Sequence, residues 1–244
     1  MLEVRQLRKA FGALKASDGI DFDVAEGETH AVIGPNGAGK TTFIGQLAGN
    51  LRPDSGRIAF GGEDITRLPA ARRARKGLAR SFQITSIYHE FSALQNVMLA
   101  VQAQSGRSGF WRDARTDASL VSPAREFLDQ VGMQNRHDVL AANLAHGEQR
   151  QLEVAMALAT RPRLLLLDEP MAGMGIEESQ RMIALLASLK RRQTIVLVEH
   201  DMDAVFRLAD RISVLVYGRI IATDTPEKIR ANPEVRKAYL GEDF

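Results

Sequence analysis

Alternating apolar and polar positions dominate the first sixty residues and predict short strands. Residues 2–5 and 20–24 alternate in this way, and residues 26–28 have the composition of a turn. A further strand is predicted over residues 57–60, after a turn at 53–56. These segments together predict a small antiparallel sheet next to the main body of the domain.

A continuous apolar run, residues 164–167, replaces this alternation later in the chain. Residues 29–33 and 194–198 also read as buried strands. A strand that is buried on both faces needs such a run, because neither face meets water. Two more strands, 212–216 and 219–222, flank a predicted Tyr217-Gly218 turn.

Helical periodicity governs the middle of the chain, from about residue 91 to residue 159. Residues 122–123 read Ser-Pro, which predicts a helix that is capped by Ser122, has Pro123 at its first position and ends at Gly132. Residues 105–116 have the composition of an exposed connection. We expect the whole range, from about residue 91 to residue 159, to form an inserted helical subdomain.

The last third of the chain adds one long and two short predicted helices. An amphipathic stretch over 182–189 ends in the basic residues 190–192, which suit the negative end of a helix dipole. Two short helices are predicted to begin at Pro226 and Pro233, with Thr225 and Asn232 as caps.

Composition narrows the class of protein. A chain of 244 residues suits one elaborated α/β domain or a core with a small subdomain. Its net charge of +2 creates no strong electrostatic field, so we expect nucleic acid not to be a partner. The absence of cysteine excludes disulfides and cysteine-based zinc sites. We expect no secretory signal and no membrane-spanning segment, so any contact with a membrane must run through a partner.

One loop carries the strongest chemical signal. It fits the Gly-x4-Gly-Lys-Ser/Thr pattern and reads Gly34-Pro35-Asn36-Gly37-Ala38-Gly39-Lys40-Thr41-Thr42. Its glycines allow backbone N–H groups to face an anion, Lys40 adds a positive charge for the β- and γ-phosphates, and Thr41 offers a hydroxyl to Mg²⁺. A strand before the loop and a helix after it make a chance match remote. The sequence therefore predicts binding of a nucleoside triphosphate with Mg²⁺.

Two acidic residues follow the apolar run at 164–167. Asp168 at the end of a buried strand can hold Mg²⁺, and Glu169 can accept a proton from the attacking water. His200 ends the next buried strand, which we expect to open on the same crevice.

A dense basic run lies between the phosphate loop and these residues. It comprises Arg72, Arg73, Arg75, Lys76 and Arg80. Binding of nucleic acid or lipid phosphate is one interpretation of the run. We favour a solvated face beside a functional loop.

The order of these motifs resembles the ATP-binding cassette of ABC transporters over essentially the whole chain, 1–244. The resemblance implies an α/β fold with a P-loop NTPase core, an N-terminal antiparallel β-subdomain and an α-helical subdomain over about 91–159. It implies that Phe11 stacks on adenine, that Gln83 touches Mg²⁺ and a membrane partner, and that His200 contacts the γ-phosphate. The family's signature segment, which closes on the ATP of a second cassette, would be Leu144-Ala145-His146-Gly147-Glu148.

Several stretches are similar to the cassettes of branched-chain amino acid importers, and the tail at 235–242 is also similar to the lipopolysaccharide-export cassette. Two positions depart from the family's pattern. Ala145 stands where the signature usually has a serine, and Gly175 stands where an aspartate is usual. These departures bear on the strength of the ATP-bound dimer.

The resemblance implies an ATPase subunit at the cytoplasmic face of the cell membrane, where it would power amino acid import. Its expected partners are transmembrane permease subunits and a second cassette, identical or related. We expect the permease to dock near Gln83 and residues 84–91, where Ile87, Tyr88 and Phe91 are predicted to form an exposed apolar set. The alternative interpretation is that these three residues belong to the core. The alternatives are a lipopolysaccharide exporter, a soluble cassette for cofactor assembly or nucleic-acid repair, and a non-hydrolysing nucleotide-gated module.

Overall fold

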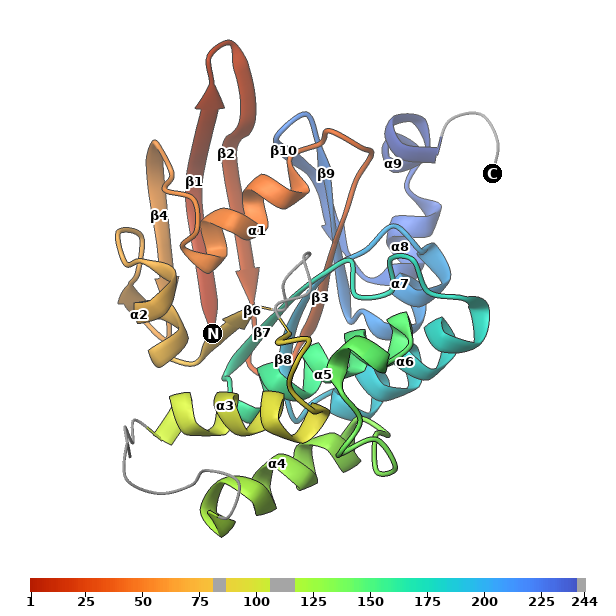
Figure 1. Ribbon diagram of the computed structural model, residues 1–244. Coiled ribbons are helices and arrows are strands. Elements are labelled where there is room, and N and C mark those ends of the chain that lie inside the picture. Colours follow the sequence, from red (N-terminus) through yellow and green to blue (C-terminus); the bar gives the residue numbers. More distant parts are fainter. Residues whose placement is uncertain (81–86, 106–116, 241–244) are drawn as a thin grey trace.

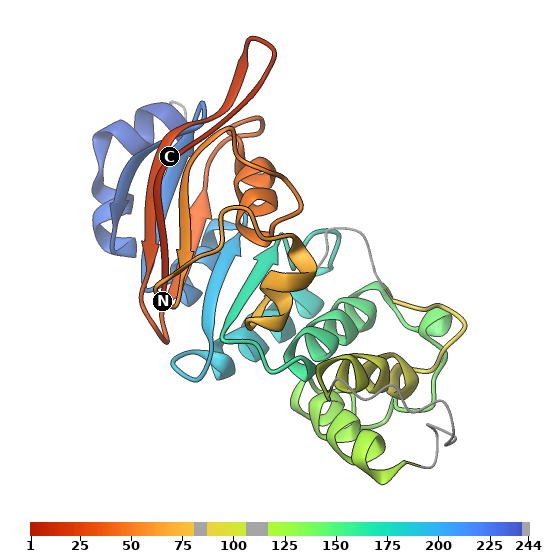
Figure 2. The ribbon, with the colours of Figure 1, turned by 90° about the vertical axis from the view of Figure 1, so that its left-hand side faces the viewer.

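The computed structural model describes residues 1–80, 87–105 and 117–240, without the side chains of the last two of these residues. Two sheets and their covering helices make up this part of the chain (Figure 1). Seen from the side, the N-terminal sheet and the helices α3 to α5 lie at opposite ends of the molecule (Figure 2). The predicted α/β fold is confirmed.

The first sheet is antiparallel, as predicted, and has the strand order β2-β1-β4-β5. Its strands are β1 (Leu2–Phe11), β2 (Leu14–Val24), β4 (Ser55–Phe60) and β5 (Glu63–Asp64). β1 and β2 are longer than the alternation indicated because irregularities at Gln6, whose φ is 48°, break the period.

The second sheet has the order β10-β9-β3-β8-β7-β6, and only β10 runs antiparallel to its neighbour. Its strands are β3 (Thr29–Ile33), β6 (Leu78–Arg80), β7 (Leu164–Asp168), β8 (Thr194–Val198), β9 (Arg211–Val216) and β10 (Arg219–Asp224). Leu164 and Leu166 pack into one apolar cluster, whereas Leu165 and Leu167 pack into another on the opposite face. The continuous apolar run predicted this two-sided burial correctly.

Helices fill the space between the sheets and cover the second sheet. They are α1 (Lys40–Ala48), α2 (Ala70–Arg75), α3 (Ala93–Ser105), α4 (Ala118–Gln130), α5 (His146–Ala159), α6 (Ile176–Leu189), α7 (Met202–Leu208), α8 (Pro226–Ala231) and α9 (Pro233–Val235), with a 3-10 turn at Ala141–Asn143 and a π-helical segment at Arg236–Leu240. α1 packs between the sheets through Phe43, Ile44 and Leu47. α7, α8 and α9 share a third cluster with β3 and β9.

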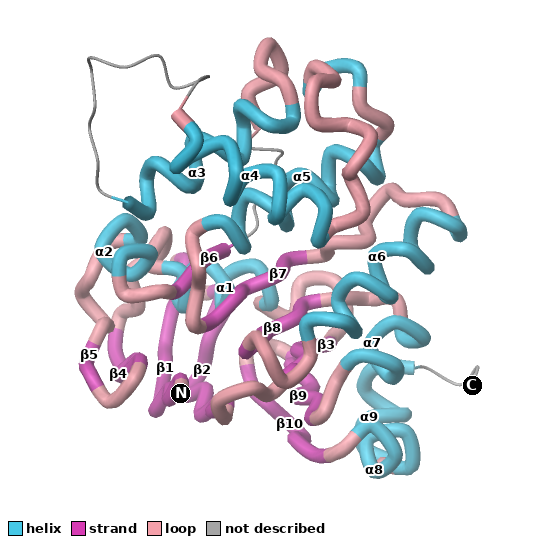
Figure 3. Tube along the Cα trace, turned by 90° about the horizontal axis from the view of Figure 1, so that it is seen from below, coloured by secondary structure: helices cyan, strands magenta, loops and turns pink. Residues whose placement is uncertain are grey.

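Helices α3, α4 and α5 pack against one another within the range predicted for a helical subdomain (Figure 3). Their apolar cluster is continuous with α6 and with one face of β7 and β8. Among the residues that the structure describes, these three helices therefore share their core with the rest of the domain, and their packing is joined directly to the strands that end at the predicted site.

The predicted start of the helix at Ser122-Pro123 is wrong. α4 begins at Ala118, where the Asp117 side chain accepts a hydrogen bond from the Ser119 N–H, and Pro123 lies inside the helix. A proline in a helix removes one backbone donor, so sequence reasoning favours it at the first turn. The two C-terminal helices do begin at Pro226 and Pro233.

The basic run is not a solvated face throughout. Arg73 is 1% exposed and donates to the carbonyls of Gln46 and Leu47 at the end of α1, as well as to those of Leu68 and Thr66. Burial lowers the pKa of Arg73 to about 10, against the influence of Asp64, so the side chain is still charged at neutral pH. Arg72 is exposed, as predicted.

In the part of the chain that the structure describes, no helix combines the length and the apolar character needed to cross a membrane.

Candidate active site

The phosphate loop joins β3 to α1 and leaves no room for side chains at two of its glycines. A Cβ atom at Gly34 would lie 2.1 Å from the Leu215 carbonyl oxygen, and one at Gly39 would lie 2.2 Å from the Ala16 carbonyl oxygen. The Ala38 carbonyl accepts a hydrogen bond from the Gly218 N–H at 2.9 Å. The loop is thus held between β2 and the β9–β10 turn, which fixes its shape before any ligand binds.

Some residues of the loop are exposed, so that a ligand can reach them, whereas others are buried and anchor the loop. Asn36, Gly37 and Thr41 are exposed, Gly39 and Thr42 are half-buried, and Ala38 is buried. α1 begins at Lys40, so the positive end of this helix dipole also faces the loop.

Lys40 lies inside the loop rather than in solvent. Its side-chain nitrogen donates to the Gly34 and Pro35 carbonyls at 2.6 and 3.1 Å, and the residue is 7% exposed. Burial lowers the pKa of Lys40, and the Glu169 and Asp168 carboxylates oppose that shift. The structure therefore brings the predicted cation and the two predicted carboxylates into one electrostatic neighbourhood.

Asp168 ends β7 and is 2% exposed. One carboxylate oxygen, Oδ2, accepts from the Arg80 guanidinium at 2.8 Å. The other, Oδ1, is buried with no hydrogen-bond partner in the described part of the chain. A buried, unpaired carboxylate oxygen fits a hard divalent cation, which in nucleotide sites is completed by phosphates and water. The donor set at this strand end therefore fits Mg²⁺.

Glu169 leaves the sheet in a backbone conformation that is rare for a non-glycine residue, with φ of 50°. Its N–H donates to the Val198 carbonyl at 2.8 Å, and its carbonyl accepts from the Ala172 N–H at 3.1 Å. Such a conformation costs on the order of 1–3 kcal/mol and persists where the surrounding structure enforces it. The half-buried Glu169 side chain thus starts from a turn that is fixed to the end of β8.

His200 follows β8, and its side chain is 61% exposed. The carboxyl ends of β3, β7 and β8 lie at the same edge of the parallel sheet, so the phosphate loop, Glu169 and His200 meet there. Sequence reasoning missed Glu199, which is buried between these loops. The sequence signal that could have identified Glu199 is its position as a charged residue directly after an apolar run.

The predicted signature segment forms the start of α5. Leu144 is buried, and the Ala145 N–H donates to Glu148 Oε2 at 3.0 Å as half of a capping box. Burial works to raise the pKa of Glu148, but hydrogen bonds from Arg136 and Ala145 outweigh it and leave the pKa below its usual value. Ala145 provides no side-chain acceptor for the first turn.

His146 and Gly147 contact the chain that follows Glu169. A Cβ atom at Gly173 would lie 3.2 Å from the His146 ring, and one at Gly147 would lie 2.6 Å from Glu178 Oε1. Glu178 in turn accepts from the Gly175 N–H at 3.1 Å. The structure thus brings the signature segment against the loop that carries Gly175, and a side chain at Gly147 would have to displace the Glu178 carboxylate.

Phe11 ends β1 and is 50% exposed. Phe11 pairs with Leu14 at the tip of the β1–β2 hairpin, which extends beyond the start of α1 (Figure 1), and the phosphate loop contacts the same hairpin at Ala16. Lys9 Nζ lies 5.5 Å from the centre of the Phe11 ring. Gln83 lies outside the described residues.

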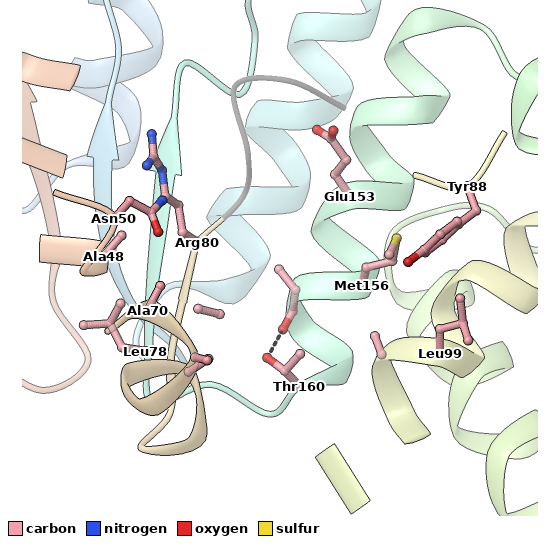
Figure 4. A pocket seen from close by; sticks show the side chains of 15 residues that line it. Ala48, Asn50, Ala70, Leu78, Arg80, Tyr88, Leu99, Glu153, Met156 and Thr160 are labelled. Atoms are coloured by element: carbon pink, nitrogen blue, oxygen red, sulfur yellow. Dashed lines mark hydrogen bonds between the residues drawn. The ribbon is translucent and has the colours of Figure 1, made fainter. Parts of the chain in front are cut away.

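An apolar groove of about 480 Å³ separates α2 and β6 from α3 and α5 (Figure 4). Arg80 lies on one side of it, whereas Tyr88, Leu99 and Met156 lie on the other. Tyr88 is 58% exposed and stacks on Phe91, with ring centres 5.4 Å apart. The prediction of an exposed Ile87 is wrong, because Ile87 is 6% exposed and packs into the core.

Comparison with known proteins agrees with this geometry. A family model described as ABC transporter matches residues 17–172, and one described as branched-chain amino acid ATP-binding cassette transporter matches residues 219–244. The chain is 39% identical to the high-affinity branched-chain amino acid transport ATP-binding protein BraF of Pseudomonas aeruginosa, over 99% of this chain and 98% of the relative. Identity to the lipopolysaccharide export system ATP-binding protein LptB of Haemophilus influenzae is 31%, over 100% and 98%.

A solved structure extends the likeness to three dimensions. The crystal structure of the ADP conformation of an ATP-binding cassette of an ABC transporter has a TM-score of 0.86 and 28% identity, and the match covers 99% of both chains. The two-sheet architecture, the phosphate loop and the acidic strand end all fall within this match. The chain therefore belongs to the ABC transporter family, as one of its ATP-hydrolysing cassettes.

Proposed function

We propose that this cassette hydrolyses ATP to drive uptake of branched-chain or related amino acids through a membrane-embedded permease. The observation that carries the proposal is the 39% identity to BraF over nearly the full length of both chains. The match of residues 219–244 to the branched-chain amino acid cassette model supports the same solute class.

We infer the following division of work at the site. Lys40, the loop N–H groups and the start of α1 bind the phosphates, and Phe11 stacks on the adenine. Thr41 and Asp168, with Gln83, hold Mg²⁺, which neutralises charge on the phosphates when bound. Glu169 accepts the proton of the attacking water, and His200 contacts the γ-phosphate. The unpaired Oδ1 of Asp168 supports its assignment as a metal ligand.

The proposed working unit is a pair of cassettes. The signature segment, Leu144 to Glu148, would close on the ATP held by the second cassette, through the Gly147 backbone and the start of α5. Ala145 lacks the usual serine hydroxyl, so backbone N–H groups carry more of this contact. Closure on ATP and reopening after hydrolysis would move the permease subunits.

The proposed permease contact is the apolar groove beside Tyr88 and Phe91. Its lining is rich in alanine and includes the exposed Tyr88, whose ring stacks on Phe91, which suits a short helix inserted from a partner. The cassette would then sit at the cytoplasmic face of the inner membrane as a peripheral subunit, held by this contact.

Glu169→Gln tests the hydrolytic assignment. The substitution keeps the shape of the side chain but removes its ability to accept a proton, so we expect nucleotide binding to survive and turnover to fall by about 10²–10⁴-fold. An ATP-bound dimer should accumulate and be visible by size-exclusion chromatography. Glu177→Gln, an exposed carboxylate in the first turn of α6, is the control and should hydrolyse normally. Normal turnover in Glu169→Gln would remove Glu169 from the mechanism.

A second candidate, lipopolysaccharide export, is favoured by the 31% identity to LptB. Purification of the cassette from membranes with its bound partners, followed by reconstitution in vesicles, separates the two. Stimulation of ATP hydrolysis and uptake by branched-chain amino acids supports import. Stimulation by lipopolysaccharide alone supports export, and recovery of the cassette without any membrane protein contradicts both.

A further inference from the structure

Glu199 is a buried carboxylate that the proposed chemistry does not use. The residue is 1% exposed and lies directly after β8. Its hydrogen bonds come from backbone N–H groups: Oε1 accepts from Met171 at 3.0 Å, and Oε2 accepts from His200 at 3.0 Å and from Asp201 at 3.4 Å. A buried carboxylate with several such donors is a strong and specific contact, because each bond is charge-assisted.

The donors belong to two different loops. Met171 lies two residues after Glu169, in the turn that leaves β7, whereas His200 and Asp201 begin the connection from β8 to α7. We propose that Glu199 is a positioning residue for ATP hydrolysis, in which one carboxylate holds the loop of the base Glu169 and the loop of His200 in a fixed mutual arrangement. This inference rests on the proposed roles of Glu169 and His200.

The shape of the carboxylate explains why glutamate suits this position. Each of its two oxygens serves a different loop, so both loops are tied to one rigid, planar group. Glutamine of the same size has one acceptor oxygen and an NH₂ group, which cannot accept from a backbone N–H. Glu199→Gln must therefore release either Met171 or His200, while the packing around the side chain is kept.

The electrostatic state of the group agrees with this role. Burial raises the pKa of Glu199, and the N–H groups of Met171, His200 and Asp201 act in the opposite direction, as does His200. His200 Nδ1 lies 3.7 Å from Oε2, so the same carboxylate also lies beside the imidazole ring.

A purely structural role predicts a different outcome, and Glu28 offers the matched control. Glu28 also has a side chain that is largely buried, and it also accepts a backbone N–H, from Ala25 at 2.6 Å, in addition to an ion pair with Arg211 at 2.7 Å. It precedes β3, at the opposite edge of the sheet from the phosphate loop. Glu28→Gln should lower the melting temperature without changing the turnover of the folded protein.

The experiment compares Glu199→Gln, Glu28→Gln and the unchanged cassette. We measure the affinity of the isolated cassette for ATP, kcat and KM of its hydrolysis, and amide hydrogen exchange of segments 170–174 and 199–203. We expect Glu199→Gln to keep nucleotide affinity and KM and to lose about tenfold to hundredfold in kcat, the size of effect that a small misplacement of a reacting group produces. Exchange should become faster in one of the two segments.

Several outcomes would overturn the proposal. They are an unchanged kcat in folded Glu199→Gln, an equal loss of kcat in Glu28→Gln, and unchanged exchange in both segments. Exchange in the unchanged cassette is a test that needs no variant, because absence of protection at Met171 and His200 contradicts the described hydrogen bonds. This test can be separated from the test of Glu169 as the base. Normal turnover in Glu169→Gln refutes the base assignment. Loss of turnover in Glu169→Gln together with normal turnover in Glu199→Gln refutes only the positioning role of Glu199.

Discussion

At the scale of single residues, charged side chains of the site already have partners within the protein, which the sequence motifs do not indicate. Lys40 donates to the carbonyls of its own loop, and Asp168 is joined to Arg80. The contacts of Lys40 keep its buried charge satisfied before a ligand arrives. Binding of a nucleotide must therefore exchange these Lys40 hydrogen bonds for new ones, whereas Oδ1 of Asp168 has no hydrogen bond to give up within the described part of the chain.

Lys40→Ala is expected to weaken nucleotide binding. It removes a charge-assisted hydrogen bond worth about 1.5–3 kcal/mol, which corresponds to roughly a tenfold to hundredfold loss in affinity. Isothermal titration with ATP and with ADP measures the loss. Lys228→Ala removes an exposed lysine paired with Asp224 and should bind normally. If Lys40→Ala binds ATP as tightly as the unchanged cassette, the phosphate-loop assignment is wrong.

The residues that sequence reasoning found and missed differ in a physical way. Lys40, Asp168 and Glu169 were predicted because their chemistry depends on short spacings next to a strand end. The burial of Arg73 and the role of Glu199 were missed because each side chain has backbone partners in another segment of the chain, which are the end of α1 for Arg73 and the turn after β7 for Glu199. A buried charge of this kind is visible only once the fold brings its donors or acceptors together.

At the scale of elements, α1 is stabilised at its end by Arg73, a contact that the sequence did not predict, and it carries the predicted phosphate loop at its start. This helix carries the phosphate loop at its first turn, and Arg73 from α2 bonds to the Gln46 and Leu47 carbonyls at its last turn. The last carbonyls of a helix have no partner within the helix, so a guanidinium satisfies them and complements the dipole. Apolar periodicity predicted α1 and the buried strands well, because those patterns are local.

Arg73→Met is expected to destabilise the cassette. Buried carbonyls that lose their donor each cost about 1–3 kcal/mol, so a total loss of several kcal/mol is expected, offset in part by the apolar packing of methionine. Denaturant unfolding measures the effect. Arg72→Met, at the exposed neighbouring position, is the control and should change the free energy of unfolding by less than about 0.5 kcal/mol. Equal stability of both variants would contradict the capping role of Arg73.

Ala145→Ser is expected to stabilise α5 even in the monomer. A serine at the N-cap adds a side-chain acceptor for the Glu148 N–H and completes the capping box whose other half is present. The gain should be about 1 kcal/mol, as judged by thermal unfolding without nucleotide. In the Glu169→Gln background, we also expect a tighter ATP-bound dimer, because the hydroxyl can reach the phosphate of the second cassette. A gain in monomer stability without a tighter dimer would show that the serine only caps α5 and does not contact the phosphate of the second cassette.

At the scale of the whole molecule, one core runs from the helices α3–α5 through α6 to the strands that end at Asp168 and Val198. A permease that contacts these helices would therefore act on the same packed unit that holds Glu169 and His200. The sequence predicted the helices but not this continuous core, because the core depends on which faces of the helices and strands pack together in the fold.

Tyr88 tests the proposed permease contact. A cysteine introduced in place of Tyr88 would be the only cysteine in the chain, so crosslinking from it is unambiguous. We expect capture of a transmembrane subunit when the cassette is assembled in its native membranes. A cysteine in place of Tyr217, which is 86% exposed near the phosphate loop, is the control and should capture none. Failure of position 88 in an assembled, active transporter would exclude the groove.

The pairing of β3 also fixes when this protein becomes competent during its synthesis. β3 leads into the phosphate loop, yet its partners are β8 and β9, with Thr29 opposite Ile195 and His30 opposite Arg211. At the usual pace of translation, about 5–20 residues per second, the ribosome needs roughly 10 to 40 s to deliver those partners after β3 has emerged. The antiparallel sheet can form in that interval, because its strands all lie within the first 64 residues. Nucleotide binding is thus among the last properties that the nascent chain acquires.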